Sequence, residues 1–253
     1  VILTNPPFGA NITDDIVITK EDIQEQKKII EKNKDKNYFL QDNILTENDL
    51  NYKVNARFKI GSKLTEVLFI ERCLNLLKKG GRMGIVLPEG VLNASNLQKC
   101  RDFVEGKAKI IMITSISQDT FKSAGASVKT SLLFFKKFTV KEEKKYSKIK
   151  KQATNEVNKK YENEIKKCEN LKAKEKKQKL KKIEIQKETE IKKIIKEKFN
   201  YQIPIAKIEN VGITTTGKET KNDLIELLKE FKEYTKNSKL WETKYKAKSI
   251  SED

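Results

Sequence analysis

The run Asn5-Pro6-Pro7-Phe8 combines residue types that could act on a planar amine. The lone pair of such an amine is delocalised into the adjoining ring or carbonyl, so a catalyst must first undo that delocalisation. The Asn5 side-chain oxygen and the Pro6 carbonyl could each accept one N–H and turn the nitrogen towards sp³ geometry. The two prolines fix the turn, so both acceptors would be aimed before a substrate arrives.

An aromatic ring follows the two acceptors. Phe8 could stack on a base extracted from a duplex, a contact worth about 1–3 kcal/mol that offsets part of the cost of unpairing. Methyl transfer to the amine would need no strong base, because the methylated amine is acidic enough to lose its proton to water. The sequence contains no histidine, which is compatible with this chemistry. The structural alternative is a rigid turn without function.

The flanking pattern predicts the elements that would position this motif. Residues 1–4 indicate the end of a buried strand, because proline cannot continue a ladder, and open α/β sheets bind ligands at such strand ends. Alternating helices and strands predict an α/β sheet buried on both faces. We also expect strands at 82–87, 109–116, 128–137 and 201–208. Four helices are expected: one at 21–32, one that begins at a Ser62 cap and stops at Gly80-Gly81, one that begins at a Ser95 or Asn96 cap, and one at 224–234 that begins at a Thr220 or Asn222 cap.

Composition changes abruptly between Lys141 and Lys198. This stretch has 22 Lys against 11 Glu, with no Gly or Pro, and supplies +11 of the net charge of +18. Its apolar residues keep helical spacing except around 172–179. Two helices folded back near Asn170 explain that gap better than one helix of about 85 Å, which would separate the flanking sheet segments.

The net charge and a pI near 9.5 would suit a polyanionic partner. However, only four basic residues are arginine, and heavy Lys, Ile and Asn usage also fits an AT-rich coding bias. Charge alone therefore leaves DNA binding and simple solubility open.

The three cysteines, Cys73, Cys100 and Cys168, share no close spacing, which argues against a disulfide framework or a metal site. No apolar run approaches the roughly 18 residues that a membrane-spanning helix needs. We therefore expect a cytoplasmic protein that contacts no membrane. The first residue is Val1 rather than Met, and we expect it to mark a boundary within a longer sequence.

Several motifs, in order over about residues 1–137, resemble those of the N-6 adenine DNA methylases typified by the methylation subunit of type I restriction-modification systems. They are Val1-Ile2-Leu3-Thr4-Asn5-Pro6-Pro7-Phe8-Gly9, Glu66 to Leu74 with Leu77-Lys78-Lys79-Gly80-Gly81-Arg82, Ile85 to Gly90, Phe121, Gly125, and Lys129 to Phe135.

The resemblance implies the C-terminal part of a class I (Rossmann-like) methyltransferase sheet. Residues 1–4 would be its fourth strand, 82–87 its fifth, and 109–116 and 128–137 its sixth and seventh. Asn5-Pro6-Pro7-Phe8 would then be the target-adenine site, with Phe121 as a second aromatic wall; a loop-anchoring core phenylalanine is the alternative for Phe121. Glu66 and Glu71 are expected on the helix surface. We divide the chain into the catalytic part (1–138), the lysine-rich hairpin as an insertion (139–199) and an extension with the tail (200–253), in which Trp241 is the expected anchor.

The family's cofactor and partners follow from the same resemblance. S-adenosylmethionine would bind at a glycine-rich turn after the first strand, with an acidic residue after the second, and this sequence contains neither. We therefore expect the cofactor site upstream of Val1 and an isolated chain without activity. The implied partners are double-stranded DNA with a flipped adenine and a specificity subunit, for which residues 224–234 would be a docking helix.

Other functions use similar residues. RNA guanine-N2 methyltransferases and the glutamine methyltransferases of release factors also carry Asn-Pro-Pro-aromatic motifs, because all methylate a planar amine or amide nitrogen. A non-catalytic module, in which the lysine-rich hairpin holds nucleic acid or a protein, is a further alternative. The hairpin could also be a solvated helix pair with no ligand.

Overall fold

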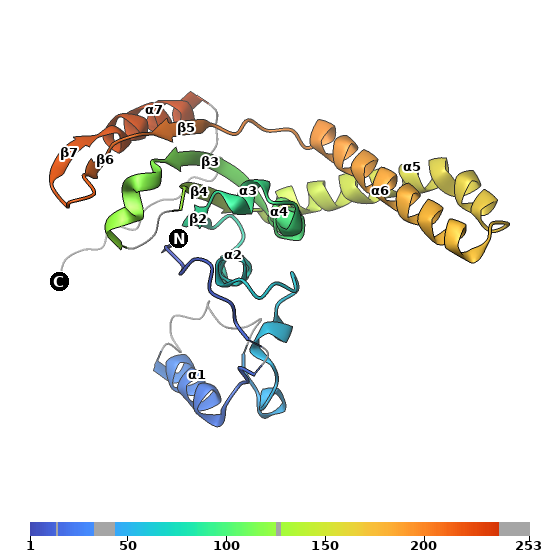
Figure 1. Ribbon diagram of the computed structural model, residues 1–253, viewed down its shortest axis with the longest axis horizontal. Coiled ribbons are helices and arrows are strands. Elements are labelled where there is room, and N and C mark those ends of the chain that lie inside the picture. The colour runs from blue at the N-terminus through green and yellow to red at the C-terminus, as the bar shows by residue number, and fades with distance from the viewer. Residues whose placement is uncertain (14, 33–43, 125–127, 238–253) are drawn as a thin grey trace.

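The computed structural model describes residues 1–13, 15–32, 44–124 and 128–237 (Figure 1). They form a mixed α/β fold around a five-stranded sheet of order β1-β2-β4-β3-β5. β1 runs parallel to β2 and β3 parallel to β5, whereas β4 is antiparallel to both of its neighbours. The fold class predicted from the sequence is confirmed. The strands are β1 (Ile2–Thr4), β2 (Arg82–Pro88), β3 (Ala108–Ile116), β4 (Thr130–Lys137) and β5 (Ile205–Ile208).

The central strands β2 and β4 run in opposite directions, so each end of this strand pair holds the start of one strand and the end of the other. Pro88, at the end of β2, lies beside Thr130, at the start of β4. Arg82, at the start of β2, lies beside Lys136 near the end of β4. We call the first the site edge, because the chain leaves β1 there for Asn5, and the second the hairpin edge, because the lysine-rich segment follows β4 there.

Two helices bury one face of the sheet, α2 (Thr65–Leu76) and α4 (Gln98–Glu105). Their apolar residues pack with the alternate residues of β2 and β4 that share this face. The buried cluster includes Val67, Ile70, Leu74, Met83, Ile85, Leu87, Cys100, Val104, Leu133 and Phe135. The expected burial therefore holds for this face.

The opposite face is less covered. Its residues include Leu3, which lies beside Gly84 and is 78% exposed. Only α7 (Asp223–Asn237) faces this part of the sheet among the described residues, across an apolar groove of about 420 Å³. The prediction of a sheet buried on both faces is wrong here, because the groove separates α7 from this part of the sheet and leaves Leu3 exposed.

The expected caps of two helices are wrong. α2 begins at Thr65 with Leu64 as its N-cap, and the Ser62 hydroxyl instead accepts the Leu64 N–H at 3.2 Å. α4 begins at Gln98, after the short α3 (Gly90–Asn93) and the 3₁₀ helix η4 (Ser95–Leu97), so neither Ser95 nor Asn96 caps it.

Gly80-Gly81 does not end α2, which stops at Leu76. Gly80 instead has a φ of 77°, in the left-handed region, and its N–H donates to the carbonyls of Lys137 and Phe138. The glycine pair therefore turns the chain into β2 and ties it to the hairpin edge.

The polar region after the motif contains the expected helix, α1 (Lys20–Lys32), and the 3₁₀ helices η2 (Glu47–Asp49) and η3 (Val54–Arg57). Single β-bridges join Val17 to Lys53 and Asn11 to Leu64. Buried Ile18 and Ile23 give this excursion a small core of its own.

The lysine-rich segment forms the predicted hairpin of α5 (Val140–Cys168) and α6 (Ala173–Lys198), which extends away from the sheet (Figure 1). Asn170 lies in the turn between the helices, as expected. Ile149, Ala153, Val157 and Ile183 are buried between them. The four-residue spacing of apolar side chains in the sequence therefore marked the helix–helix contact.

After the hairpin, β5 covers only the second half of the expected strand, and β6 (Val211–Ile213) pairs with β7 (Glu219–Asn222). Asn222 caps α7, since its Oδ1 accepts the Leu224 N–H at 3.1 Å, whereas Thr220 lies within β7. Trp241 and Gly125 fall outside the described residues, and the domain boundaries stay predictions. Among the described helices, none is long and apolar enough to cross a membrane.

Candidate active site

The motif Asn5-Pro6-Pro7-Phe8 lies where the sequence placed it, directly after β1 at the site edge. Pro6 is buried, Phe8 is half-buried and Asn5 is exposed. A buried proline next to an exposed amide fixes the backbone while it leaves the amide oxygen open to a ligand.

The first turn of α2 holds the chain on both sides of Phe8. The Thr65 hydroxyl donates to the Pro7 carbonyl at 2.9 Å and lies 3.2 Å from the Ala10 carbonyl. The Glu66 carboxylate accepts the Gly9 N–H at 3.2 Å. Gly9 has a φ of 69°, which favours glycine, so the loop can bend back to meet this carboxylate.

The expectation that Glu66 and Glu71 lie on the helix surface is wrong, since their exposed fractions are 5% and 1%. The Glu71 carboxylate accepts the N–H groups of Lys59 and Ile60 at 2.7 and 2.9 Å. Both carboxylates therefore supply acceptors to irregular backbone that has no ladder partner. Helical spacing indicates the burial of both side chains, because Glu66 is four residues before Ile70 and Glu71 is four after Val67, but it does not identify their backbone partners.

Thr65 and Glu66 were missed as contributors to the site. Glu66 belongs to one of the family motifs but was expected on the helix surface, and Thr65 had no signal in the sequence. Their contacts reach 57 residues back along the chain for Glu66 and 58 for Thr65, so only the fold could reveal them.

The structure brings the two predicted aromatic residues together. The ring centroids of Phe8 and Phe121 are 6.5 Å apart, and the ring planes are nearly perpendicular at 89°. Phe121 lies in the 3₁₀ helix η5 (Gln118–Ala124), between β3 and β4, and is half-buried. Its position agrees with a wall beside Phe8 better than with a core anchor, and its role in base binding stays a prediction.

The cysteines offer no alternative nucleophile. All three are free and buried. Burial raises the pKa of the Cys73 thiol, and it raises the pKa of the Cys100 thiol to about 12. Within the described residues no cluster of Cys, Asp and Glu could hold a metal ion.

The residues present do not fit a complete S-adenosylmethionine site. By the resemblance noted above, that site needs a glycine-rich turn after one strand and an acidic residue after the next, and this sequence contains neither. At the site edge, Glu66 is committed to the Gly9 N–H, and Glu89 pairs with Lys129 at 3.4 Å. What the site offers instead is a pair of carbonyl acceptors and an aromatic face.

Three solved structures with similar stretches come from restriction-modification proteins. A chain from a structure of the type I R-M system is 24% identical over 53% of this chain, with a TM-score of 0.35. A modification subunit assigned to a type I restriction enzyme of Vibrio vulnificus YJ016 is 19% identical over 53%, with a TM-score of 0.34. The M protein of the type I restriction enzyme EcoKI is 27% identical over 33%, with a TM-score of 0.30.

The chain spans 20%, 22% and 17% of the length of those three solved chains. At such TM-scores they carry no argument about this chain. Comparison with curated proteins gives no match.

A family model supplies the decisive comparison. The model of the N-6 DNA methylases matches residues 41–211, which is more than half of the chain and runs from before α2 to β6. The match includes the hairpin and leaves Asn5-Pro6-Pro7-Phe8 and α7 outside. The chain belongs to the N-6 DNA methylase family.

Proposed function

We propose that this chain supplies the base-binding and amine-activating part of an adenine-N6 DNA methyltransferase of a restriction-modification system. The observation that carries the proposal is Asn5-Pro6-Pro7-Phe8 at the carboxyl end of β1, held by the first turn of α2, in a member of the N-6 DNA methylase family.

In this proposal the adenine amine lies between two acceptors. The Asn5 amide oxygen accepts one N–H and the Pro6 carbonyl accepts the other, which frees the nitrogen lone pair. Thr65 and Glu66 hold the loop, so the acceptors need no reorganisation when the base enters. The proton released after methylation passes to water.

Phe8 stacks on the extruded base, and Phe121 forms the second wall. The two rings now meet edge to face, so a base stacked on both requires one ring to turn. This would make base entry a step that also moves η5.

We propose S-adenosylmethionine as the methyl donor on the basis of the family. When bound, it supplies a methyl group on a sulfonium centre. The site of this chain does not hold it, and no step of the proposal is assigned to residues that would do so.

We propose double-stranded DNA with a flipped adenine as the substrate and a specificity subunit as the partner. α7 is the candidate docking helix, because its apolar residues Ile225 and Leu228 are 58% and 53% exposed. The helix lies outside the family match, which suits a surface that differs between family members.

Methyl transfer should be assayed with the gene product as encoded in full. Radiolabelled S-adenosylmethionine is offered with duplex DNA, ribosomal RNA or a release factor, and we expect label on adenine N6 of DNA alone. Asn5→Ala should lower the single-turnover rate by about 10²- to 10³-fold, as expected for loss of a preorganised acceptor.

Asn11→Ala is the matched control, because Asn11 lies in the same loop and joins Leu64 only through a backbone bridge. Its rate should stay within twofold of the unchanged protein. Label found only in RNA or in the release factor would refute the proposal and favour the guanine-N2 or glutamine enzymes. An unaffected Asn5→Ala rate would also refute it.

A further inference from the structure

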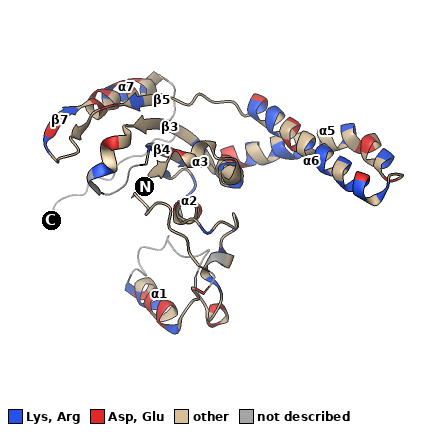
Figure 2. Cartoon of the chain, in the orientation of Figure 1, with Lys and Arg blue, Asp and Glu red and all other residues tan. Residues whose placement is uncertain are grey.

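Lysines and carboxylates alternate along both helices of the hairpin (Figure 2), but the lysines of α5 are not spread evenly around the helix. At 3.6 residues per turn, six lysines of α5 fall within a sector of about 80° that faces away from α6, and the first five of them form no ion pair with a described residue, unlike Lys166. All five are exposed. We call them the α5 lysine stripe: Lys141, Lys144, Lys148, Lys151 and Lys159.

Carboxylates of the hairpin pair with lysines outside the stripe. Glu142 binds Lys109 at 2.7 Å, and Glu190 of α6 binds Lys160 at 2.6 Å. Glu143 pairs with Lys79, Glu156 with Lys198 and Glu162 with Lys166. In the part of the chain that the structure describes, no stripe lysine has an ion pair. Lys159 lies near Glu162, whose pKa is lowered by the hydrogen bond and charge of Lys166 and also by the charge of Lys159, so the stripe is an excess of positive charge with one partly compensated member.

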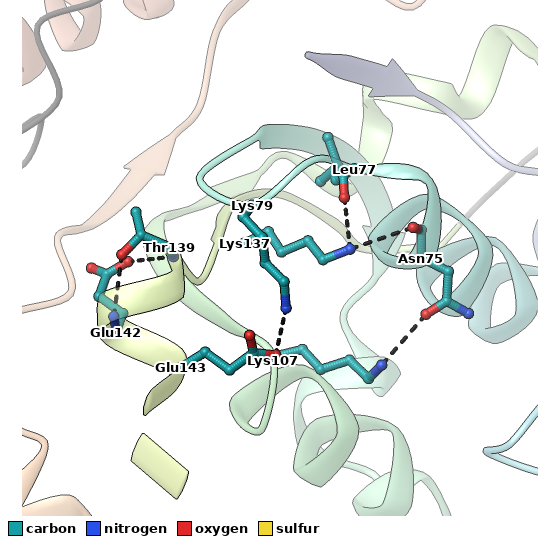
Figure 3. A network of polar contacts seen from close by, with 8 residues as sticks. All are labelled: Asn75, Leu77, Lys79, Lys107, Lys137, Thr139, Glu142 and Glu143. Atoms are coloured by element: carbon teal, nitrogen blue, oxygen red, sulfur yellow. Dashed lines mark hydrogen bonds and ion pairs between the residues drawn. The ribbon is translucent and has the colours of Figure 1, made fainter. Parts of the chain in front are cut away.

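The base of α5 is fixed to the sheet (Figure 3). Thr139 and Glu142 form a reciprocal capping box, and Lys137 donates to the Leu77 carbonyl at 2.6 Å. The rings of Phe138, Tyr146, Phe199 and Tyr201 pack in a chain of edge-on and tilted contacts across the base. A fixed base presents the stripe in one orientation, which lowers the entropy cost of binding.

α6 has a second anchor, an ion pair of Lys192 with Asp102 of α4 at 2.7 Å. Its own exposed lysines are interspersed with Glu175 and Glu184 and form no comparable row. α5 and α6 are therefore similar in composition, but only α5 presents a continuous row of lysines.

Topology places the stripe away from the base site. β4 runs from the site edge to the hairpin edge, and α5 begins three residues after β4 ends. A ligand of the stripe is therefore not the target base itself.

We propose that the α5 lysine stripe binds the phosphate backbone of duplex DNA that flanks the target site. The stripe runs from Lys141 to Lys159, about 27 Å of helix, which matches about 8 base pairs of duplex. It contains no aromatic or aliphatic side chain, whereas protein interfaces concentrate such residues and deplete lysine. Lysine point charges bind phosphate without reading sequence. The choice of DNA as the polyanion rests on the proposed function.

Salt dependence of binding tests the stripe directly. The 253-residue chain is titrated into a fluorescently labelled 30-base-pair duplex at several salt concentrations, and binding is followed by anisotropy. The stripe variant carries Lys→Gln at all five stripe positions. A control variant carries the same five changes on exposed, unpaired lysines of α6: Lys174, Lys177, Lys179, Lys181 and Lys182.

Both variants lose the same net charge, so a difference between their DNA affinities or salt slopes shows which lysines contact the duplex. Each phosphate contact contributes about 0.9 to the slope of log K against log salt. We expect the stripe variant to lose about 4 in slope and at least tenfold in affinity, and the control to lose less than 1 in slope. Circular dichroism of both variants checks that the hairpin remains helical.

Equal losses in the two variants would overturn the proposal, because diffuse charge would then explain binding. An unchanged stripe variant, or no salt-dependent binding by the unchanged chain, would also overturn it. Stripe-dependent binding to poly-glutamate without binding to the duplex would indicate an acidic protein partner instead. The chain with Asn5→Ala should keep the full slope, so failure of the stripe and failure of the methylation site are told apart.

Discussion

At the residue scale, Thr65 and Glu66 explain how an exposed loop can hold acceptors in place. A carbonyl stabilises a developing charge only if it is aimed beforehand, and the short loop from Asn5 to Ala10 is not rigid by itself. The Thr65 hydroxyl fixes the Pro7 carbonyl, and Glu66 fixes the Gly9 N–H, on either side of Phe8. The acceptors thus depend on α2, an element far along the chain.

Removal of the Thr65 hydroxyl should therefore impair methylation without removing an acceptor. We expect Thr65→Val, which keeps the side-chain shape, to lower the single-turnover rate of the full gene product by about tenfold, equivalent to about 1.4 kcal/mol. Thr65→Ser keeps a hydroxyl and should restore at least half of the rate. A merely structural role would instead give two variants with similar rates that differ only in thermal midpoint.

At the element scale, Glu142 joins the hairpin to the sheet. Its carboxylate caps the first turn of α5 by accepting the Thr139 N–H and pairs with Lys109 and the buried Lys136. Burial by itself would raise the pKa of Glu142, but the hydrogen bonds from Lys109 and Thr139 and the two lysine charges lower it to about 2. The ionised form is therefore favoured by folding.

Acid should remove this contribution over a defined range. A pKa lowered from 4.5 to about 2 stabilises the fold fully above pH 4.5, and the stabilisation is lost as the pH falls towards 2. We expect Glu142→Gln to lower the free energy of unfolding by about 1–3 kcal/mol at pH 7. The difference from the unchanged chain should shrink below pH 4.5, as measured by urea denaturation.

Glu162→Gln is the control for this measurement, because Glu162 forms an exposed pair with Lys166 on the same helix. Exposed pairs of this kind contribute little, so we expect no measurable change in the free energy of unfolding at any pH. A Glu142→Gln difference that stayed constant from pH 7 to pH 2.5 would show that ionisation of Glu142 is not what stabilises the base of the hairpin.

At the scale of the whole molecule, the proposed function assigns this chain one half of a reaction. It holds the acceptors and the stacking ring, but its sequence has no glycine-rich turn followed by an acidic residue, and the carboxylates Glu66 and Glu89 at the site edge are engaged. The chain also spans only a fifth or so of the solved chains it matches.

The 253-residue chain should accordingly bind no methyl donor. We expect isothermal titration with S-adenosylmethionine to give no heat above dilution up to millimolar ligand. Circular dichroism checks that the same sample is folded, so that a titration without heat can be attributed to the absence of a cofactor site rather than to unfolding. A dissociation constant in the micromolar range would contradict this division of the reaction.

Much of the fold could be predicted because its signals are local. Proline after Thr4 ended a strand, four-residue spacing from Ile149 marked a helix contact, and the gap in that spacing marked the turn at Asn170. Caps were less predictable. Ser62 is a residue type that often caps helices, but its hydroxyl accepts the Leu64 N–H, which precedes α2. α2 starts at Thr65, whose hydroxyl binds the Pro7 carbonyl in the loop of Asn5-Pro6-Pro7-Phe8.

The sequence by itself determined the order of the elements, the existence of the hairpin and the place of Asn5 after a strand, because prolines and helical spacing act over a few residues. Only the tertiary structure decided that Glu66 is buried against Gly9, that Phe121 meets Phe8, and that the lysines of α5 project from the edge opposite the site. These depend on which strands pair and in which direction. β4 enters antiparallel beside β2, and that single choice puts the start of β4 at the site and its end at the hairpin.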